Sequence, residues 1–510
     1  MRPASDFSFI QLSNSRARTN LQMYCFYVIM SCGINYKGVI FMQTEKQNVT
    51  ENKMGTMPVD KLLISMSLPM MISMLVQALY NVVDSIFVSR ICENALTAVS
   101  LAFPIQSLMI SLGAGMGVGV NALLSRSLGE KDFDKVNKSA MNGIFLSVLS
   151  YLVFVIIGIF VTKPFYQSQT SDPEIIAYGV EYLTIVCCCS FGMYMQFIFE
   201  RILQATGRTF YTMLTQGLGA IINIILDPIL IFGLLGFPKL GVAGAAVATV
   251  IGQIVAGIAA LIVNLKKNDE VRLHFKGFRP DPTTIKQIYV VGLPSIIMQS
   301  IGSVMTYGMN RILITFSSTA TAVFGVYFKL QSFIFMPVFG LNNGMVPIIA
   351  FNYGAQKKER LVHTIKLSIC YAEALMFIGF LVFQFLPEPL FLLFDASDHM
   401  LSMGVPALRI ISVHFLLAGF CIIIGSVFQA LGNGVYSMIV SIARQLVVLL
   451  PAAYLLSRLG DVNYVWWAFP IAELSSLAIS VFFLIKINKK IISKIGKESN
   501  PMPHPESSSL

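Results

Sequence analysis

Asp227 lies in the middle of an apolar run, Ile221 to Ile231, and its chemistry demands an explanation more than that of any other residue. A carboxylate at the centre of a membrane-spanning helix costs about 2.5–3.5 kcal/mol on insertion scales, so it is kept where it has a function. Such a carboxylate binds either a cation or a proton. Asn223 lies four residues earlier and therefore on the same face of a helix.

Two more oxygen-bearing side chains reach a similar depth from other apolar segments. Asp84 lies about 23 residues, or roughly 35 Å, along a first segment that runs outward from about residue 61. Thr249 lies about one to two turns into the sixth segment, which runs inward. Two carboxylates, a carboxamide and a hydroxyl form a hard-oxygen set that suits Na⁺ or a shared proton. We therefore predict one cation or proton site at Asp84, Asn223, Asp227 and Thr249.

Three further polar residues are candidates for substrate binding or proton relay. Gln77 and Tyr80 are spaced to line much the same helix face as Asp84, which gives the first segment a polar stripe. Glu200 lies far along the fourth segment, next to Arg201. Two interpretations of Glu200 stay open: an ion pair with Arg201 at the membrane surface, or a role at the cytoplasmic end of a transport cleft.

The segments that must position these residues indicate an all-α polytopic membrane protein. Hydrophobic residues make up 55% of the 510 residues and charged residues only 12%, about half the share in soluble proteins. Twelve apolar runs are each long enough to cross a hydrocarbon core of about 30 Å. Because these runs are continuous and do not alternate with polar residues, a β-barrel is excluded. The predicted transmembrane helices cover residues 61–88, 97–126, 139–162, 176–203, 208–235, 242–265, 285–315, 321–351, 364–386, 402–430, 435–457 and 464–487.

The chain repeats itself at an offset of 225 positions. Pro69 corresponds to Pro294 and Gly129 to Gly354, among other matches in the same order. Each copy has six helices, an even number, so both copies enter the membrane in the same orientation. The repeat predicts two six-helix lobes related by pseudo-two-fold symmetry along the membrane normal, an arrangement that suits alternating access.

The predicted site belongs to the first lobe alone, since at the same offset Asp84 corresponds to Met309 and Asp227 to Ala452. The duplication also divides the chain. For residues 1–53 we expect an N-terminal extension that is disordered or a misassigned start, with an extra membrane segment as the alternative. The remaining predicted parts are an N-lobe of helices 1–6 (54–265), a cytoplasmic linker (266–284), a C-lobe of helices 7–12 (285–490) and a cytoplasmic tail (491–510).

The positions of the basic residues argue for membrane topology and against nucleic-acid binding, although the net charge is +10. Basic residues gather after helices 2, 8 and 12 and in the connections between helices 4 and 5 and between helices 6 and 7. The alternate loops contain only Arg90, Lys163, Lys239 and Arg458. By the positive-inside rule, the C-terminus is expected in the cytoplasm.

Motifs of soluble enzymes do not occur in the sequence. It contains no CxxC, HExxH, GxSxG or Walker-type loop, and its five histidines are scattered. The run Cys187-Cys188-Cys189 lies inside a predicted membrane helix, where small packing residues are expected and a disulfide framework is not. We therefore expect a protein that is not an enzyme and needs no cofactor.

Three motifs in order resemble the multidrug and toxic compound extrusion (MATE) family. They are Asp84 within Tyr80–Val88, the segment Asn223–Pro228, and Gly241–Thr249. The resemblance covers about residues 60–490 and is to the prokaryotic DinF-like branch. It implies a multi-pass secondary active antiporter of the inner (cytoplasmic) membrane, which exports organic, often cationic compounds in exchange for H⁺ or Na⁺. The expected partners are lipophilic or cationic small molecules and membrane lipid, and the expected state is a monomer.

The resemblance also implies roles for individual residues. Asp84, Asn223, Asp227 and Thr249 match the N-lobe cation site of that branch, and Ala245 matches the position that supplies a backbone oxygen. Asp84 and Asp227 would then share a proton or hold Na⁺. Members of the NorM-like branch have acids in helices 7 and 10, but helix 10 of this chain (402–430) contains none. No cation site is therefore expected in the C-lobe.

A lipid-linked oligosaccharide flippase of the same superfamily is the alternative function. Such a protein would need a cationic central cavity for pyrophosphate. Four basic residues in or near helices of the C-lobe keep this alternative open: Arg311, Lys329, Arg409 and Arg444. A membrane-embedded prenyl transferase is not favoured, because the sequence has no Asp-rich DDxxD-like run.

Overall fold

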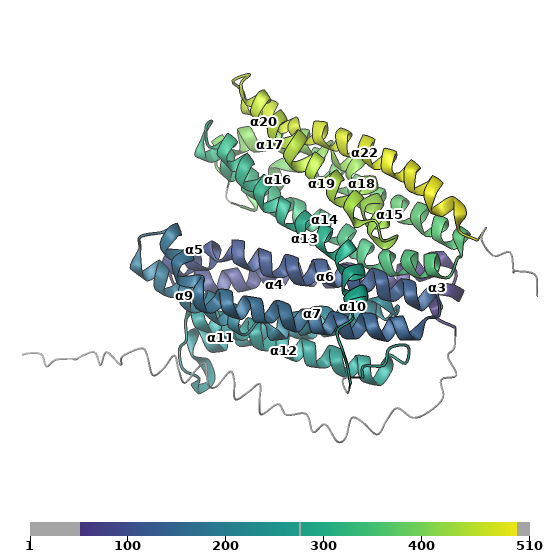
Figure 1. The fold of residues 1–510 in the computed structure, drawn as a ribbon. Helices are drawn as coiled ribbons and strands as arrows, with labels where there is room; N and C mark the ends of the chain where they lie inside the picture. The colour runs from purple at the N-terminus through teal and green to yellow at the C-terminus, as the bar shows by residue number, and fades with distance from the viewer. Residues whose placement is uncertain (1–50, 275–276, 395, 497–510) are drawn as a thin grey trace, which may run out of the picture. The chain divides into compact units, whose positions relative to one another are not determined.

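The computed structural model in Figure 1 describes residues 51–274, 277–394 and 396–496, and every regular element in them is helical. Of the predicted N-terminal extension, only Glu51, Asn52 and Lys53 fall within this part of the chain, and Lys53 begins a short helix. The predicted disorder or extra membrane segment at residues 1–50 lies outside the described residues.

The first half of the described chain forms one bundle, drawn purple to teal in Figure 1. Its spans are α4 (Val59–Ser89), α6 (Phe103–Gly129), α7 (Phe133–Phe160), the pair α9 (Pro173–Cys188) and α10 (Phe191–Ala205), α11 (Thr209–Phe232) and α12 (Val242–Lys267). The shorter helices of this half are α3 (Lys53–Thr56), α5 (Glu93–Leu101), α8 (Thr162–Gln169) and η2 (Leu234–Gly236).

The second half forms the other bundle, drawn green to yellow in Figure 1. Its spans are α13 (Pro282–Leu313), α14 (Ser318–Gly354), α15 (Lys358–Phe385), the pair α17 (Asp398–Ser412) and α18 (Phe415–Ala430), the series α19 (Gly434–Ile442), η3 (Ala443–Leu449) and α20 (Leu450–Ser457), and α22 (Ala468–Lys490). The shorter helices are α16 (Pro387–Leu392), α21 (Val462–Trp466) and η4 (Ile492–Lys494). We refer to α4–α12 as the N-lobe and to α13–α22 as the C-lobe.

The described helices agree with the twelve predicted membrane spans. Ten are long and apolar enough to cross a membrane, and two bent pairs bring the number to twelve. The bends are 44° between α9 and α10 and 50° between α17 and α18, so the fourth span of each lobe is broken. The apolar runs 176–203 and 402–430 predicted both spans, but neither bend.

The outer faces of the helices are apolar, as expected for surfaces in contact with lipid. On α7, Leu152, Ile156 and Phe160 are all exposed and follow one another at four-residue intervals, which places them on one stripe. Phe154 and Gly158, on the opposite stripe, are buried against the bundle. The apolar runs of the sequence therefore supply both the core of each lobe and its outer surface.

The lobes meet along a seam formed by α4 and α6 of the N-lobe and α13 and α14 of the C-lobe. At the end of α6, a Cβ atom added to Gly129 would lie 2.0 Å from the carbonyl oxygen of Phe351. At the end of α14, a Cβ atom added to Gly354 would lie 2.1 Å from the carbonyl oxygen of Arg126. The two contacts are equivalent under the 225-residue offset. Glycine is needed at both positions because two helix backbones approach each other there.

The first half of α4 packs against α14 in the same close way. The Ser67 hydroxyl donates to the carbonyl oxygen of Leu341 at 3.3 Å. Cβ atoms added to Gly340 and Gly344 would lie 2.5 Å from the Cα of Met71 and from the hydroxyl of Ser67, respectively. One end of α4 is thus tied to the C-lobe.

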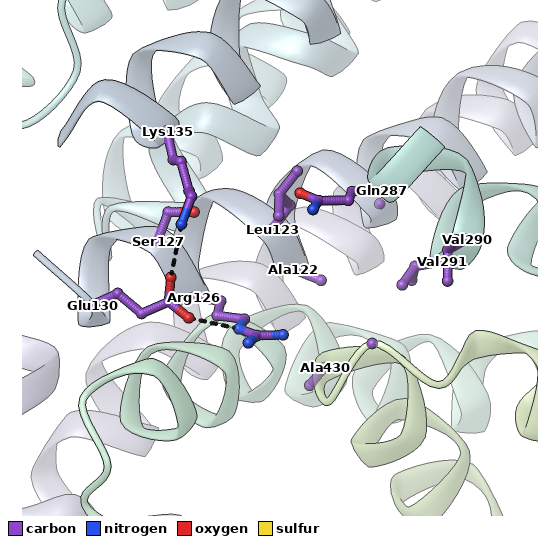
Figure 2. A pocket seen from close by; sticks show the side chains of 12 residues that line it. Ala122, Leu123, Arg126, Ser127, Glu130, Lys135, Gln287, Val290, Val291 and Ala430 are labelled. Atoms are coloured by element: carbon purple, nitrogen blue, oxygen red, sulfur yellow. Dashed lines mark hydrogen bonds and ion pairs between the residues drawn. The ribbon is translucent and has the colours of Figure 1, made fainter. Parts of the chain in front are cut away.

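A pocket lies beside the seam, where the end of α6 faces α13 and the turn after α18 (Figure 2). Val290 and Val291 line one side, and Arg126, Glu130 and Lys135 line the other. Arg126 donates to Glu130 at 2.8 Å, and the Lys135 ammonium lies 3.9 Å from the second oxygen of the same carboxylate. Since both cations are paired, we regard the pocket as part of the seam and not as an anion site.

Candidate functional site

The predicted cation or proton residues lie on three packed helices of the N-lobe, α4, α11 and α12. Close backbone packing of α11 on α12 sets their positions. A Cβ atom added to Gly252 would lie 2.7 Å from the Gly219 oxygen, and one added to Gly244 would lie 2.6 Å from the Leu230 oxygen. These two contacts enclose the part of the interface that contains Asn223 and Thr249.

Asn223 connects the site residues of α11 and α12. Its side-chain amide donates to the Thr249 hydroxyl at 3.2 Å and to Asp227 Oδ1 at 3.4 Å. Asp227 has no exposed surface and Asn223 is 3% exposed. The four-residue spacing placed Asn223 and Asp227 on one helix face as predicted, and the structure turns that face toward α12.

Three oxygens of the site are buried without a hydrogen-bond partner: Asp84 Oδ1, Asn223 Oδ1 and Asp227 Oδ2. Leaving a buried acceptor unpaired costs about 1–3 kcal/mol, and more for a charged group. Asp84 and Asp227 are close enough for their charges to interact, although they come from different helices. A Na⁺ ion or a proton bound here would satisfy oxygens that the protein leaves unpaired.

The other residues named from sequence take different places. Tyr80 lies within electrostatic range of both Asp84 and Asp227. Ala245 is fully buried on α12, one turn before Thr249, so its carbonyl oxygen already accepts a bond from the helix and keeps one lone pair. Gln77 makes no hydrogen bond to the cluster within the described structure, although it lies on the same helix as Asp84.

Two residues that were not predicted from the sequence also border the site. Tyr182 on α9 lies within electrostatic range of Asp84 and Tyr80. Its hydroxyl accepts a hydrogen bond from the side-chain amide of Gln106 on α6 at 3.1 Å. Gln106 corresponds to Gln331 at the 225-residue offset but is otherwise an ordinary polar residue, and Tyr182 has no distinguishing sequence context. The site therefore draws on five helices of the N-lobe.

Glu200 belongs to a separate polar network. It is 2% exposed on α10, and its Oε1 accepts from the Gln196 amide at 3.0 Å and from the Thr215 hydroxyl at 3.3 Å. Arg201 instead donates to Gln204 and, across the seam, to Asn343 of the C-lobe. The structure therefore does not form the Glu200–Arg201 ion pair that was one of the two interpretations. Thr215 lies 12 residues before Asp227 on α11, about 18 Å away along the helix.

The C-lobe contains an internal ion pair where the N-lobe has its site. Arg444 in the π-helix η3 donates to Glu473 of α22 at 3.1 Å, and Glu473 is 2% exposed. At the 225-residue offset Glu473 corresponds to Ala248, the neighbour of Thr249. A positively charged side chain, that of Arg444, thus already occupies the interface between η3 and α22 of the C-lobe.

No group of three or more His, Cys, Asp or Glu residues is arranged to hold a metal within the part of the chain that the structure describes. A site for a transition metal, which favours nitrogen and sulfur ligands, is therefore not indicated there. The oxygen cluster at Asp84, Asn223, Asp227 and Thr249 is of the kind that alkali cations and protons use.

Comparison with known proteins agrees with both the duplication and the fold. The MatE family model matches residues 69–229 and again residues 294–455, so the two matches begin 225 positions apart. Together they cover more than half of the chain. The chain belongs to the MatE family. It is therefore a multi-pass membrane protein of a transporter family and not of an enzyme family.

The relatives share a low sequence identity with this chain, but the similarity covers nearly their whole length. The chain is 28% identical to the multidrug export protein MepA of Staphylococcus haemolyticus, over 84% of this chain and 94% of that protein. It is 27% identical to MepA of Staphylococcus aureus strain MRSA252, over 82% and 91%.

Solved structures are similar over most of this chain. An outward-facing multidrug resistance MATE family transporter of the MOP superfamily has a TM-score of 0.82 and 26% identity, covering 88% of this chain and 100% of that one. A MOP superfamily transporter from Pyrococcus furiosus has a TM-score of 0.79 and 26% identity, covering 88% and 99%. These neighbours confirm the predicted all-α fold of two lobes.

Proposed function

We propose that this MatE protein is a multidrug efflux antiporter, which exports organic, often cationic compounds in exchange for H⁺ or Na⁺. The observation that carries the proposal is the trio of unpaired buried oxygens on Asp84, Asn223 and Asp227. Among the described residues no Lys or Arg pairs with either carboxylate, and two interacting buried carboxylates are stabilised by a bound cation or proton. The multidrug export named for the relatives supports the direction and the substrate class.

Helix α4 provides a physical connection between ion binding and lobe movement. Its second half carries Asp84, and its first half is tied to α14 through Ser67. Pro69, between the two, cannot donate a helix hydrogen bond, so the helix is locally easier to bend there. An ion that binds near Asp84 more tightly in one conformation than in the other would shift the balance between the two.

The proposed orientation places the C-terminus and the seam between Gly129 and Gly354 in the cytoplasm. The basic loops after helices 2 and 8 and the basic linker lie on this side. In this orientation Asp84 lies toward the outer face and Glu200 toward the inner face. We place the protein in the inner (cytoplasmic) membrane and expect it to act as a monomer.

The test is transport by the purified protein in proteoliposomes, with Na⁺ and pH gradients imposed separately. We expect uptake of an ethidium-like cation that depends on one of the two gradients and stops when that gradient is collapsed by an ionophore. Transport of the cation without either gradient would contradict antiport. Liposomes without protein provide the control for leakage.

The flippase alternative has less support from the basic residues that kept it open. Arg444 is paired with Glu473, Arg409 donates to a backbone oxygen of Gln384, and Lys329 lies over the ring of Phe394. These three cations therefore have partners inside the C-lobe. Movement of an undecaprenyl-linked sugar, but not of the organic cation, in the same proteoliposomes would favour the flippase instead.

Replacement of Glu200 by Gln is expected to slow proton-driven efflux by about five- to tenfold, within the usual range of coupling between sites. Glu200 contacts α11 through Thr215, and the adjacent Gln216 accepts a hydrogen bond from Ser73 of α4. This network extends from α10 toward the ion-binding helices. The Gln side chain has nearly the shape of the Glu side chain that it replaces, but it cannot take up and release a proton. The rate would be measured in proteoliposomes with an inward proton gradient.

The control for this variant is Glu93→Gln, which changes an exposed carboxylate on α5. An unchanged proton-driven rate in Glu200→Gln would exclude the relay role and leave Glu200 as a packing residue. The melting temperature of both variants should stay close to that of the unsubstituted protein.

A further inference from the structure

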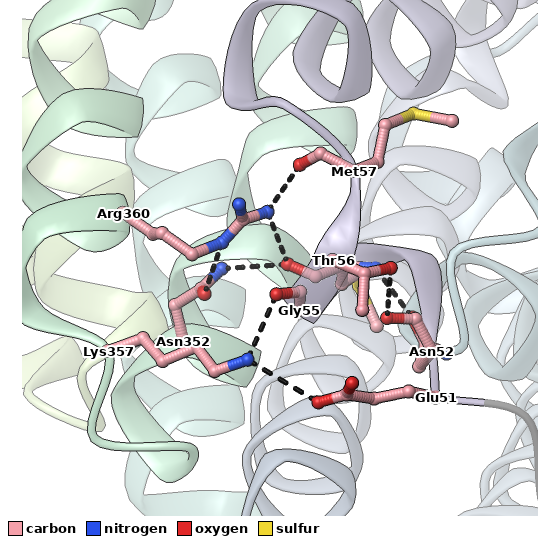
Figure 3. Close-up of polar contacts among 9 residues, drawn as sticks. Glu51, Asn52, Gly55, Thr56, Met57, Asn352, Lys357 and Arg360 are labelled. Carbon is pink, nitrogen blue, oxygen red and sulfur yellow. Dashed lines mark hydrogen bonds and ion pairs between the residues drawn. The ribbon is translucent and has the colours of Figure 1, made fainter.

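The segment Glu51–Met57 precedes α4 and bonds to both lobes at their inner side. Figure 3 shows its contacts with the C-lobe. Residues 51–53 fell within the predicted N-terminal extension, and nothing in their sequence suggested a function. The contacts of this segment are specific and come from residues far apart in the chain.

On the C-lobe side, three side chains donate to backbone oxygens of the segment. Arg360 of α15 donates to Met54 at 3.0 Å and to Met57 at 2.6 Å, and Lys357 donates to Gly55 at 2.9 Å. Asn352 at the end of α14 donates to Met54 at 3.3 Å. Figure 3 shows these donors converging on the end of α3.

The choice of acceptors has a structural reason. α3 has only four residues, Lys53–Thr56, so its carbonyl oxygens lack most of the partners that a longer helix would provide. Cations near the carboxyl end of a helix are favourable, and Arg360 and Lys357 supply two. The C-lobe thus satisfies acceptors that the segment cannot satisfy itself.

On the N-lobe side, Asn52 makes the connection. Its side-chain amide donates to the carbonyl oxygen of Thr206 at 3.2 Å and to Glu270 Oε1 at 2.5 Å. Its Oδ1 accepts from the Met54 amide at 2.8 Å and so caps α3. Lys53 packs over Gly207, whose added Cβ would lie 3.1 Å from Lys53 Cε. Burial lowers the pKa of Lys53, and the nearby Arg208 lowers it further.

The segment also covers the seam itself. The Met54 side chain has no exposed surface. A Cβ atom added to Gly55 would lie 3.0 Å from the ring of Phe351, the residue whose backbone oxygen meets Gly129 across the seam. A movement that separates α6 from α14 at this end must therefore break one of these sets of bonds or be taken up by α4, into which the segment continues.

We propose that Glu51–Met57 is a strap that holds the inner ends of the two lobes together and so sets how readily the protein opens to the cytoplasm. On the N-lobe side the strap is held by Asn52 and by its continuation into α4, and on the C-lobe side by Arg360, Lys357 and Asn352. This inference concerns the conformational equilibrium and does not depend on which compound or ion is transported.

The test measures the distance between the inner ends of the lobes by double electron–electron resonance between two spin labels. Spin labels at the exposed positions Asp134 and Glu359 report on the N-lobe and C-lobe, respectively. The triple variant Asn352→Ala, Lys357→Ala and Arg360→Ala removes the side-chain donors of the C-lobe attachment. Asn52→Ala removes the side-chain bonds of the N-lobe attachment. Each is expected to raise the population with a longer distance about tenfold, because bonds to charged groups and a lost cap each contribute on that order.

A combined variant decides whether the segment acts as a strap. Adding Asn52→Ala to the triple variant should shift the distances no further than the triple variant alone, because a segment released from the C-lobe no longer joins the lobes. Additive shifts, or unchanged distances in the triple variant, would overturn the proposal. Arg360→Gln alone gives a second variant should the triple variant fold poorly. Lys366→Ala, which removes an exposed cation from the same helix, is the matched control and should leave the distances unchanged.

Discussion

Replacing Asp227 by Asn is expected to reduce gradient-driven efflux of an organic cation at least about tenfold, while the protein still folds and reaches the membrane. Asn has nearly the shape of Asp and can still pair with Asn223, whose amide lies 3.4 Å from Asp227 Oδ1. It cannot take up a proton, and it provides a weaker ligand for Na⁺ because it has no charge. Since Asp227 has no exposed surface, the solvent does not compensate for the lost charge.

The measurement is whole-cell efflux of a fluorescent cation, together with the same assay in proteoliposomes. Asp134→Asn makes the same chemical change at an exposed N-lobe position outside the site and should leave efflux unchanged. Undiminished gradient-driven efflux in Asp227→Asn would remove Asp227 from the coupling site. Equal amounts of folded protein, checked by size-exclusion chromatography, would show that the loss is one of function and not of folding.

The sequence predicted those parts of the fold and site whose residues would cost much free energy in any other environment or arrangement. Twelve apolar runs predicted twelve spans because a helix needs about 20 apolar residues to cross the hydrocarbon core of a membrane. Asp227 was identifiable because a charge in that environment is costly, and Asn223 followed from helix periodicity. The 225-residue offset predicted the equivalence of Gly129 and Gly354, which the structure places at equivalent contacts of the seam.

The parts that the sequence did not predict depend on contacts whose residues carry no such cost. Tyr182 and Gln106 are uncharged, so neither residue stands out from ordinary helix-packing residues before the helices are assembled. The strap is held mainly through backbone oxygens at Met54, Gly55 and Met57, which every sequence possesses. The partner of Glu200 could not be chosen from sequence either, because Arg201 is its neighbour in the chain but donates to other residues.

Replacing Gly129 by Ala is expected to open the inner seam and to reduce efflux by about tenfold or more. The added Cβ would lie 2.0 Å from the Phe351 oxygen and 2.9 Å from the Ala355 amide nitrogen. Both are backbone atoms within or next to α14, so neither can move aside as a flexible side chain would. Overpacking of this kind typically costs about 1–3 kcal/mol, which is sufficient to shift a conformational ratio by roughly five- to 150-fold.

The cost falls on one conformation only, and that makes the substitution informative. Only the state with the inner seam closed brings Gly129 against α14, so the variant should accumulate with its inner end open and fail to complete the transport cycle. Hydrogen exchange at the inner ends of α6 and α14 should become faster, while exchange at the outer end of α11 should not change. Gly354→Ala should give the same result, because its Cβ would meet the Arg126 oxygen in the equivalent contact.

Gly325→Ala is the matched control, since it lies on α14 and an added Cβ would meet no atom within 4 Å. It should leave both exchange and efflux unchanged, which would separate the effect of a blocked seam from that of a methyl group on the same helix. Normal efflux in Gly129→Ala would mean that the seam can close with α6 and α14 further apart than the structure has them. Normal efflux in Gly354→Ala together with a loss in Gly129→Ala would instead mean that the two lobes do not contribute equally, in spite of their duplicated sequence.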